Sequence, residues 1–151
     1  MALQLVSLLE EQGEVLLRMW QLAGQQREAL KEGQFSTLQE MMKDFQALSS
    51  RALALEASRQ RESLALGKKL SCPPVLTEFV RHIPEDEDAE ALRQAGITLL
   101  KAIKKLRAEM HLLEKLLQEQ SALNELLINE WRRLEGLPGM DPSGGSFDFR
   151  G

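Results

Sequence analysis

The feature that most constrains the fold of this chain is an apolar residue at nearly every third or fourth position along three long stretches. Because an α-helix turns once in about 3.6 residues, this spacing places the apolar side chains on one face. The stretches cover residues 2–31, 36–66 and 85–135, and each predicts an amphipathic helix. With its polar interruptions, the longest row reads Leu92, Gly96, Leu99, Ile103, Leu106, Met110, Leu113, Leu117, Gln120, Asn124, Leu127, Trp131 and Leu134.

The first break in this pattern lies at Gly33. Ser36 follows, with Gln39 three residues later, and this spacing is typical of a capping box at a helix start. The sequence therefore predicts that the first helix ends near Lys31 and that a second begins near Ser36.

The second break contains a glycine and two consecutive prolines. Gly67 and the pair Pro73 and Pro74 are expected to end the second helix, because proline lacks a backbone N–H and clashes with the preceding turn. A short helix of about three turns is predicted from Pro73 to His82, and Pro84 ends it. The acidic run at residues 85–88 suits the start of the last helix, where negative charge complements the macrodipole.

Short links between long amphipathic helices favour antiparallel neighbours. We therefore predict an all-α fold: an antiparallel helical bundle of three long helices plus one short helix, formed by residues 1–135. Residues 136–151 hold five of the ten glycines and two of the five prolines, and this composition excludes a helix. They are predicted to form a C-terminal tail, either flexible or docked on the helices.

Composition and charge exclude several classes of function. The net charge of -4 and the mixed charges near Lys101 argue against a nucleic-acid partner. No apolar run approaches the 20 or so residues that span a bilayer, so we expect no membrane insertion. Cys72 is the single cysteine and cannot form an intrachain disulfide. These properties predict a cytoplasmic protein.

The chain offers little for catalysis. Its two histidines, His82 and His111, do not stand in a metal-ligand or triad spacing. His111 and Glu114 match one half of a di-iron site in a helical bundle, but such a site needs a second half and two more carboxylates. No nucleotide-binding or hydrolase motif is present. We therefore expect no enzymatic activity, no cofactor and no metal.

Polar residues interrupt the rows at positions that should face other helices. Two readings are open: buried polar groups that fix the helix register, or polar atoms that orient an incoming helix in an uncovered groove. Arg59 is expected to pair with Glu62 or Glu56 on its own helix. The positions are Gln12, Gln26, Arg59, Glu62, Gln120 and Asn124.

The last helix is apolar around much of its circumference near its end, where Leu116, Leu123, Leu126 and Ile128 flank the main row. Such a segment must be covered on several sides. Three occupants fit: a second copy of the chain in a homodimer, a partner helix lying in a groove, or the tail. Phe147 and Phe149 in the tail are expected to fold back over residues 123–131 or to anchor a partner.

The order of these signals resembles the FlgN-like family of flagellar export chaperones. The matching stretches are the first helix ending in REALKEGQF, the LEASR at residues 55–59, the short TEFV helix, and the last helix with LNELL leading to a loose tail. The resemblance implies an all-helical bundle that binds the helical C-terminal ends of hook-associated flagellar proteins and delivers them to the flagellar export apparatus.

Carried over by position, the resemblance places the partner-binding region in residues 113–134 and the tail. In the tail, Phe147 and Phe149 stand where family members tend to carry a tyrosine. The expected partner-binding residues are Leu113, Leu116, Leu117, Gln120, Leu123, Asn124, Leu127, Trp131, Phe147 and Phe149.

Two functional hypotheses result. The first is a cytoplasmic chaperone of flagellar type III export that keeps hook-filament junction proteins from assembling prematurely. The alternative is a structural or adaptor bundle that associates with itself through the same apolar face and has no role in export.

Overall fold

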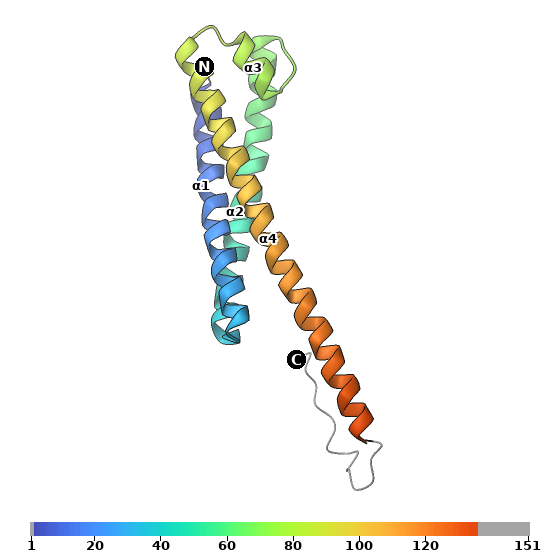
Figure 1. Cartoon of the computed structure of the whole chain (residues 1–151). Helices are drawn as coiled ribbons and strands as arrows, with labels where there is room; N and C mark the ends of the chain where they lie inside the picture. The colour runs from blue at the N-terminus through green and yellow to red at the C-terminus, as the bar shows by residue number, and fades with distance from the viewer. Residues whose placement is uncertain (1, 136–151) are drawn as a thin grey trace. The chain divides into compact units, whose positions relative to one another are not determined.

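The computed structural model describes residues 2–135, apart from the side chains at positions 121–124, 126, 127, 131, 134 and 135. It contains helices α1 (Leu3–Lys31), α2 (Phe35–Leu70), α3 (Leu76–His82) and α4 (Asp86–Glu135), and no strand occurs in this part of the chain. The prediction of an all-α fold with three long helices and one short helix is confirmed (Figure 1). The predicted tail, residues 136–151, lies outside the described residues.

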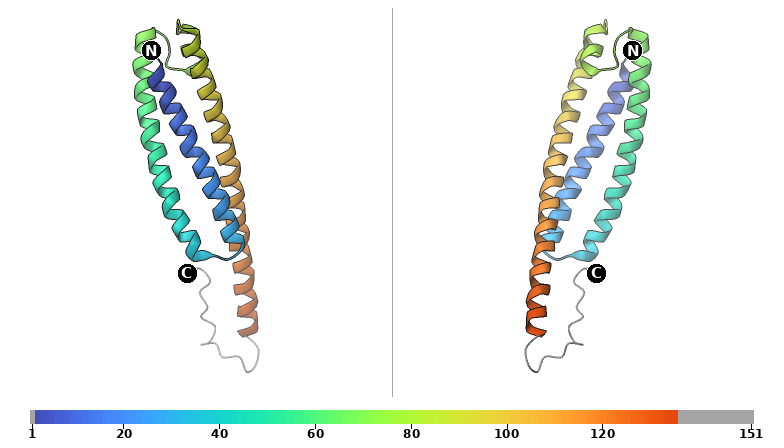
Figure 2. Two further views of the ribbon diagram at one scale, coloured as in Figure 1. Left: turned by 90° about the vertical axis from the view of Figure 1, so that its left-hand side faces the viewer. Right: turned by 90° about the vertical axis from the view of Figure 1, so that its right-hand side faces the viewer.

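The chain divides into two units, Met1–His111 and Leu112–Gly151. The first unit contains α1, α2, α3 and residues 86–111 of α4. In this unit α1 and α2 are antiparallel, and α4 starts beside the N-terminus of α1 and runs antiparallel to α2 (Figures 1 and 2). The described part of the second unit is the remainder of α4, residues 112–135.

The turn between α1 and α2 depends on Gly33, whose φ is 71°. Glycine adopts this left-handed conformation without steric cost, and it commonly ends a helix in this way. The Gln34 N–H donates to the Ala29 carbonyl at 2.9 Å, and α2 begins at the next residue. The predicted capping box is therefore wrong: Gln34 is the N-cap, it makes no side-chain cap, and Ser36 already lies inside the helix.

Gly67 does not end α2, contrary to the sequence prediction. The helix continues to Leu70 and ends at Ser71, which has a φ of 52°, and the Cys72 N–H donates to the Gly67 carbonyl at 3.1 Å. Gly67 instead provides space, because a Cβ there would lie 3.1 Å from the Cys72 carbonyl oxygen and 3.4 Å from Pro74.

Helix α3 is shorter than predicted, with seven residues. The residue before a proline disfavours helical backbone, so Pro73 cannot begin a helix ahead of Pro74. The extended residue Val75 then serves as the N-cap. The acidic start of α4 is confirmed, with Asp86, Glu87 and Asp88 in its first turn.

Two groups of buried apolar side chains hold the first unit together. The α3-end core joins the start of α1, the end of α2, α3 and the start of α4, and Phe79 and Leu92 are fully buried in it. The central core lies further along α1 and α2. The α3-end core consists of Ala2, Leu5, Val6, Leu9, Leu66, Phe79, Ile83, Ala89, Leu92 and Ala95, and the central core of Val15, Met19 and Leu55 with half-buried neighbours.

A glycine allows α3 to pack closely on α4. A Cβ at Gly96 would lie 2.2 Å from the Cδ2 of Leu76, a distance that real atoms do not adopt. The absence of a side chain at Gly96 therefore makes room for the first residue of α3. Leu76 packs against the α3-end core from this position.

Candidate functional site

The predicted partner-binding residues all fall in the second unit. Leu117 is half exposed, while Leu113, Leu116 and Gln120 are partly buried. Leu112, which was not predicted, is 47% exposed. These residues of α4 present a helical surface with leucines that reach solvent.

Other predicted members of this site lie outside the described residues. The side chains of Leu123, Asn124, Leu127 and Trp131 belong to α4 but are not among those described, and Phe147 and Phe149 lie in the undescribed tail. Their role in binding a partner stays a prediction.

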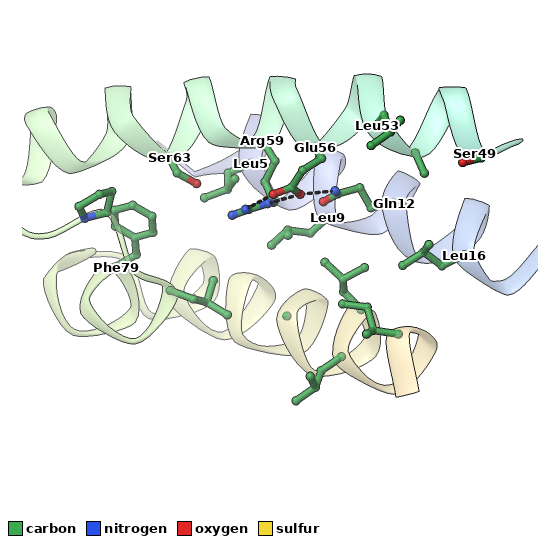
Figure 3. A pocket seen from close by; sticks show the side chains of 17 residues that line it. Leu5, Leu9, Gln12, Leu16, Ser49, Leu53, Glu56, Arg59, Ser63 and Phe79 are labelled. Atoms are coloured by element: carbon green, nitrogen blue, oxygen red, sulfur yellow. Dashed lines mark hydrogen bonds and ion pairs between the residues drawn. The ribbon is translucent and has the colours of Figure 1, made fainter. Parts of the chain in front are cut away.

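A second candidate site, which the sequence did not predict, is a cavity of about 650 Å³ within the first unit. All four helices contribute to it: α1 from Leu5 to Leu16, α2 from Ser49 to Ser63, α3 with Phe79, and α4 from Gly96 to Ile103 (Figure 3). We call it the body groove. Its walls are largely leucine, isoleucine and alanine side chains.

The polar part of the body groove is a chain of three side chains. The Gln12 Nε2 donates to Glu56 Oε2 at 2.8 Å, and the Arg59 Nε donates to the same oxygen at 2.8 Å. The Arg59 Nη2 donates to Glu56 Oε1. The three groups lie in a row across the groove (Figure 3). Of the two carboxylates expected to pair with Arg59, the structure selects Glu56.

The charges of this row compensate one another. Hydrogen bonds from Arg59, and to a smaller extent from Gln12, lower the pKa of Glu56 to about 2 against the opposing effect of partial burial. The same pair raises the pKa of Arg59. Both groups therefore stay ionised at neutral pH, and the row has no net charge.

One atom of the row is not satisfied. Gln12 is 7% exposed, and its Oε1 has no hydrogen-bond partner in the described part of the chain. A buried acceptor without a partner costs about 1–3 kcal/mol. The sequence predicted that Gln12 and Gln26, which interrupt an apolar row, face other helices. Both are buried, which confirms this prediction.

A second polar link joins α1 to the first-unit part of α4. The Arg27 Nε donates to Glu109 Oε1 at 2.6 Å, and this bond raises the pKa of Arg27. The Lys105 ammonium also lies 4.9 Å from the centre of the Trp20 ring, within the range of a cation–π contact. These contacts stabilise packing and suggest no chemistry.

Among residues 2–135, no group of three or more histidine, cysteine, aspartate or glutamate side chains is placed to hold a metal ion. His111 and Glu114 therefore belong to no such group in the described part. In the same part, no helix has the length and apolar character needed to cross a bilayer.

Comparison with known proteins identifies the family. The family of FlgN proteins matches residues 1–136, which is most of the chain. The chain belongs to the FlgN family. FlgN proteins are chaperones of flagellum assembly and are not known as enzymes. The FlgN resemblance noted in the sequence is thereby confirmed.

The FlgN match extends over both units, because it covers all four helices. No curated protein and no solved structure matches the chain. Family membership assigns a flagellar export chaperone in general terms.

Proposed function

We propose that this FlgN protein is a cytoplasmic chaperone of flagellar type III export. It binds the helical C-terminal ends of hook-associated proteins, prevents their premature assembly and delivers them to the export apparatus. Residues 113–134 of α4 and the tail bind the client.

The observation that supports this proposal is the exposure of leucines on α4 beyond residue 111. On α4, Leu112 is 47% exposed and Leu117 is 50% exposed. The chain that carries this helix belongs to a family of chaperones, which bind other proteins. Leucine side chains that reach solvent on one helix are suited to packing against the apolar face of a second helix. A client segment that folds as it binds would also be released readily, because ordering the segment consumes part of the binding free energy.

The proposal is tested with a peptide that comprises the C-terminal segment of a hook-associated protein from the same organism. Calorimetric titration into the intact chain should give a 1:1 complex. Leu117→Glu should weaken binding at least about tenfold, because it loses an apolar contact and places a charge in the interface.

Leu64→Glu serves as the matched control, because Leu64 is an exposed leucine on α2, outside this region. It should leave the affinity for the client peptide unchanged. The absence of binding to the peptide, or equal effects of the two substitutions, would contradict the proposal. A stable dimer in light scattering that Leu117→Glu dissociates would support the self-associating adaptor instead.

A further inference from the structure

We infer that the solvent face of α4 in the first unit is a self-complementary surface, through which two copies of the chain associate as an antiparallel dimer. It lies in the first unit, whereas the client site proposed above lies in the second. The inference therefore goes beyond the proposed function, and either can fail without the other. We call this surface the mirror face, and it consists of Glu87, Glu90, Gln94, Ile97, Lys101 and Lys104.

The six residues of the mirror face follow one another at alternating steps of three and four. In a helix this spacing forms a single row, and two helices pack side by side along such rows. The row spans about 26 Å at 1.5 Å per residue. All six residues are exposed, whereas Leu92, Ala95 and Ala102 are the buried residues of the same part of α4. The fold of one copy therefore does not use this face.

The charges of the mirror face are arranged symmetrically along the helix. Glu87 and Glu90 lie before the midpoint between residues 95 and 96, and Lys104 and Lys101 lie equally far behind it. A second copy that lies antiparallel, with its midpoint opposite the first, places Glu87 against Lys104 and Glu90 against Lys101. Twofold symmetry repeats each pair, so the interface contains four ion pairs. A parallel arrangement would instead place like charges together, which favours the antiparallel one.

The charges of this face are open to a second copy because little within the chain competes for them. Glu87, Lys101 and Lys104 take part in no ion pair among the described residues. The single acidic residue between positions 91 and 113 is Glu109, which is buried and accepts a hydrogen bond from Arg27.

Glu90 differs from the other charged residues of the face, because its carboxylate is already bound within α4. It accepts from Arg93 at 2.6 and 2.9 Å and from Gln94 at 3.0 Å. A carboxylate has about four acceptor positions, so it can also accept from Lys101 of the second copy. The bonds within α4 hold the Glu90 side chain in place for that contact.

The dimer should be weak, because its interface is small and mostly polar. Exposed ion pairs contribute little each. The apolar part of the contact is limited to Ile97, which is 36% exposed, and the neighbouring Leu100, which is 51% exposed. We expect a dissociation constant on the order of 100 μM at low salt. The pairs should be lost near 1 M salt, where the Debye length falls to about 3 Å.

Sedimentation equilibrium of the intact chain tests the dimer directly, at concentrations from about 10 μM to 1 mM. Glu87→Lys and Lys104→Glu are the variants, because neither residue has an ion pair within the described chain to lose. Each substitution places like charges opposite each other twice, so each variant alone should associate at least about tenfold more weakly than the native chain. Circular dichroism verifies that both retain their helices.

An equal mixture of the two variants should regain the association that each has lost. The substituted lysine of one chain then faces the substituted glutamate of the other, and the native pair forms in the other half of the interface. A loss of stability in either variant would not produce this rescue. Lys68→Glu is the matched control, because it makes the same change of charge at an exposed lysine of α2, and it should associate like the native chain.

Three results would overturn the inference. The first is a native chain that stays monomeric at about 1 mM in low salt. If this monomer binds a poly-glutamate peptide and Lys104→Glu does not, the occupant is an acidic partner rather than a second copy. The second is a mixture of the two variants that does not associate. The third is a dimer that Leu117→Glu dissociates and Glu87→Lys leaves intact, which would place the contact in the second unit.

Discussion

Glu56 has one carboxylate but links two helices, because it accepts from Gln12 on α1 and from Arg59 on its own helix. The sequence could mark Gln12 and Arg59 as polar members of apolar rows. It could not choose between Glu56 and Glu62 as the partner of Arg59, since both lie within one turn of it. The packing of α2 against α1 selects Glu56, because Glu56 also accepts a hydrogen bond from Gln12 on α1.

The lowered pKa of Glu56 predicts how stability depends on pH. The folded-state pKa of about 2 lies below the ordinary value of 4.5. The contribution of Glu56 is therefore fully present above about pH 4.5 and is lost as pH falls towards 2. Thermal unfolding should show Glu56→Gln less stable than the native chain at neutral pH, with the difference shrinking through this range.

Glu114→Gln is the control for this measurement, because Glu114 is an exposed residue of α4 and does not belong to the row of Gln12, Glu56 and Arg59. Glu114→Gln removes a carboxylate that takes no part in these hydrogen bonds, so it separates the effect of the row from that of losing one negative charge. A Glu56→Gln difference that stays constant down to about pH 2 would show that the carboxylate does not stabilise the fold through its charge.

At the scale of the element, periodicity predicted the bodies of the long helices, and local rules failed at their ends. The predicted capping box at Ser36 does not form. The left-handed turn at Gly33 lets backbone N–H groups donate to the last carbonyls of α1, and α2 begins before Ser36. The sequence predicted that α2 ends at Gly67, but Ser71 is its C-cap. Gly67 stays inside the helix, and Cys72 and Pro74 of the following loop pack against the space left by its missing side chain. Such tertiary contacts have no signal in a single stretch of sequence.

The packing of α3 on α4 makes Gly96 an informative position. Replacing a helical glycine by alanine normally adds about 1 kcal/mol of stability. At Gly96 the new Cβ would lie 2.2 Å from the Cδ2 of Leu76, so the end of this flexible side chain has to move. Chemical denaturation should therefore show Gly96→Ala gaining clearly less than the roughly 1 kcal/mol expected of an unobstructed helical glycine.

Gly13→Ala is the matched control, since it is also a helical glycine and nothing lies within 4 Å of its added Cβ. It should gain up to about 1 kcal/mol. Combining Gly96→Ala with Leu76→Ala should remove the clash, so the two substitutions should be less harmful together than their separate effects predict. An equal gain at both glycines would contradict the prediction and show that the Leu76 side chain gives way to the new Cβ without cost.

At the scale of the whole molecule, the described cores belong to one unit. The buried apolar residues of the described chain all lie between Ala2 and Ala102. The body groove could not be predicted from the sequence. Its walls come from four segments that are far apart in the sequence, and only the packed fold brings them together. The client site on α4 was inferred from family resemblance, and it remains a proposal.

The distribution of buried residues predicts that a chain ending at His111 folds by itself. Circular dichroism should show a cooperative thermal transition and helical content per residue close to that of the intact chain. The fragment should also fail to bind the client peptide, because it lacks residues 113–134. An unfolded fragment would show that the second unit is needed to stabilise the first.

The links between α1 and α2 also restrict how the two helices can move. Gln12 bonds Glu56 at 2.8 Å, and the neighbouring Glu11 pairs with Arg51 at 2.9 Å. A slide by one helical turn, about 5.4 Å, would separate both pairs at once and would also leave the Gln12 Nε2 without the partner it has in Glu56. The two helices therefore keep a fixed register, and any widening of the groove has to come from tilting helices apart.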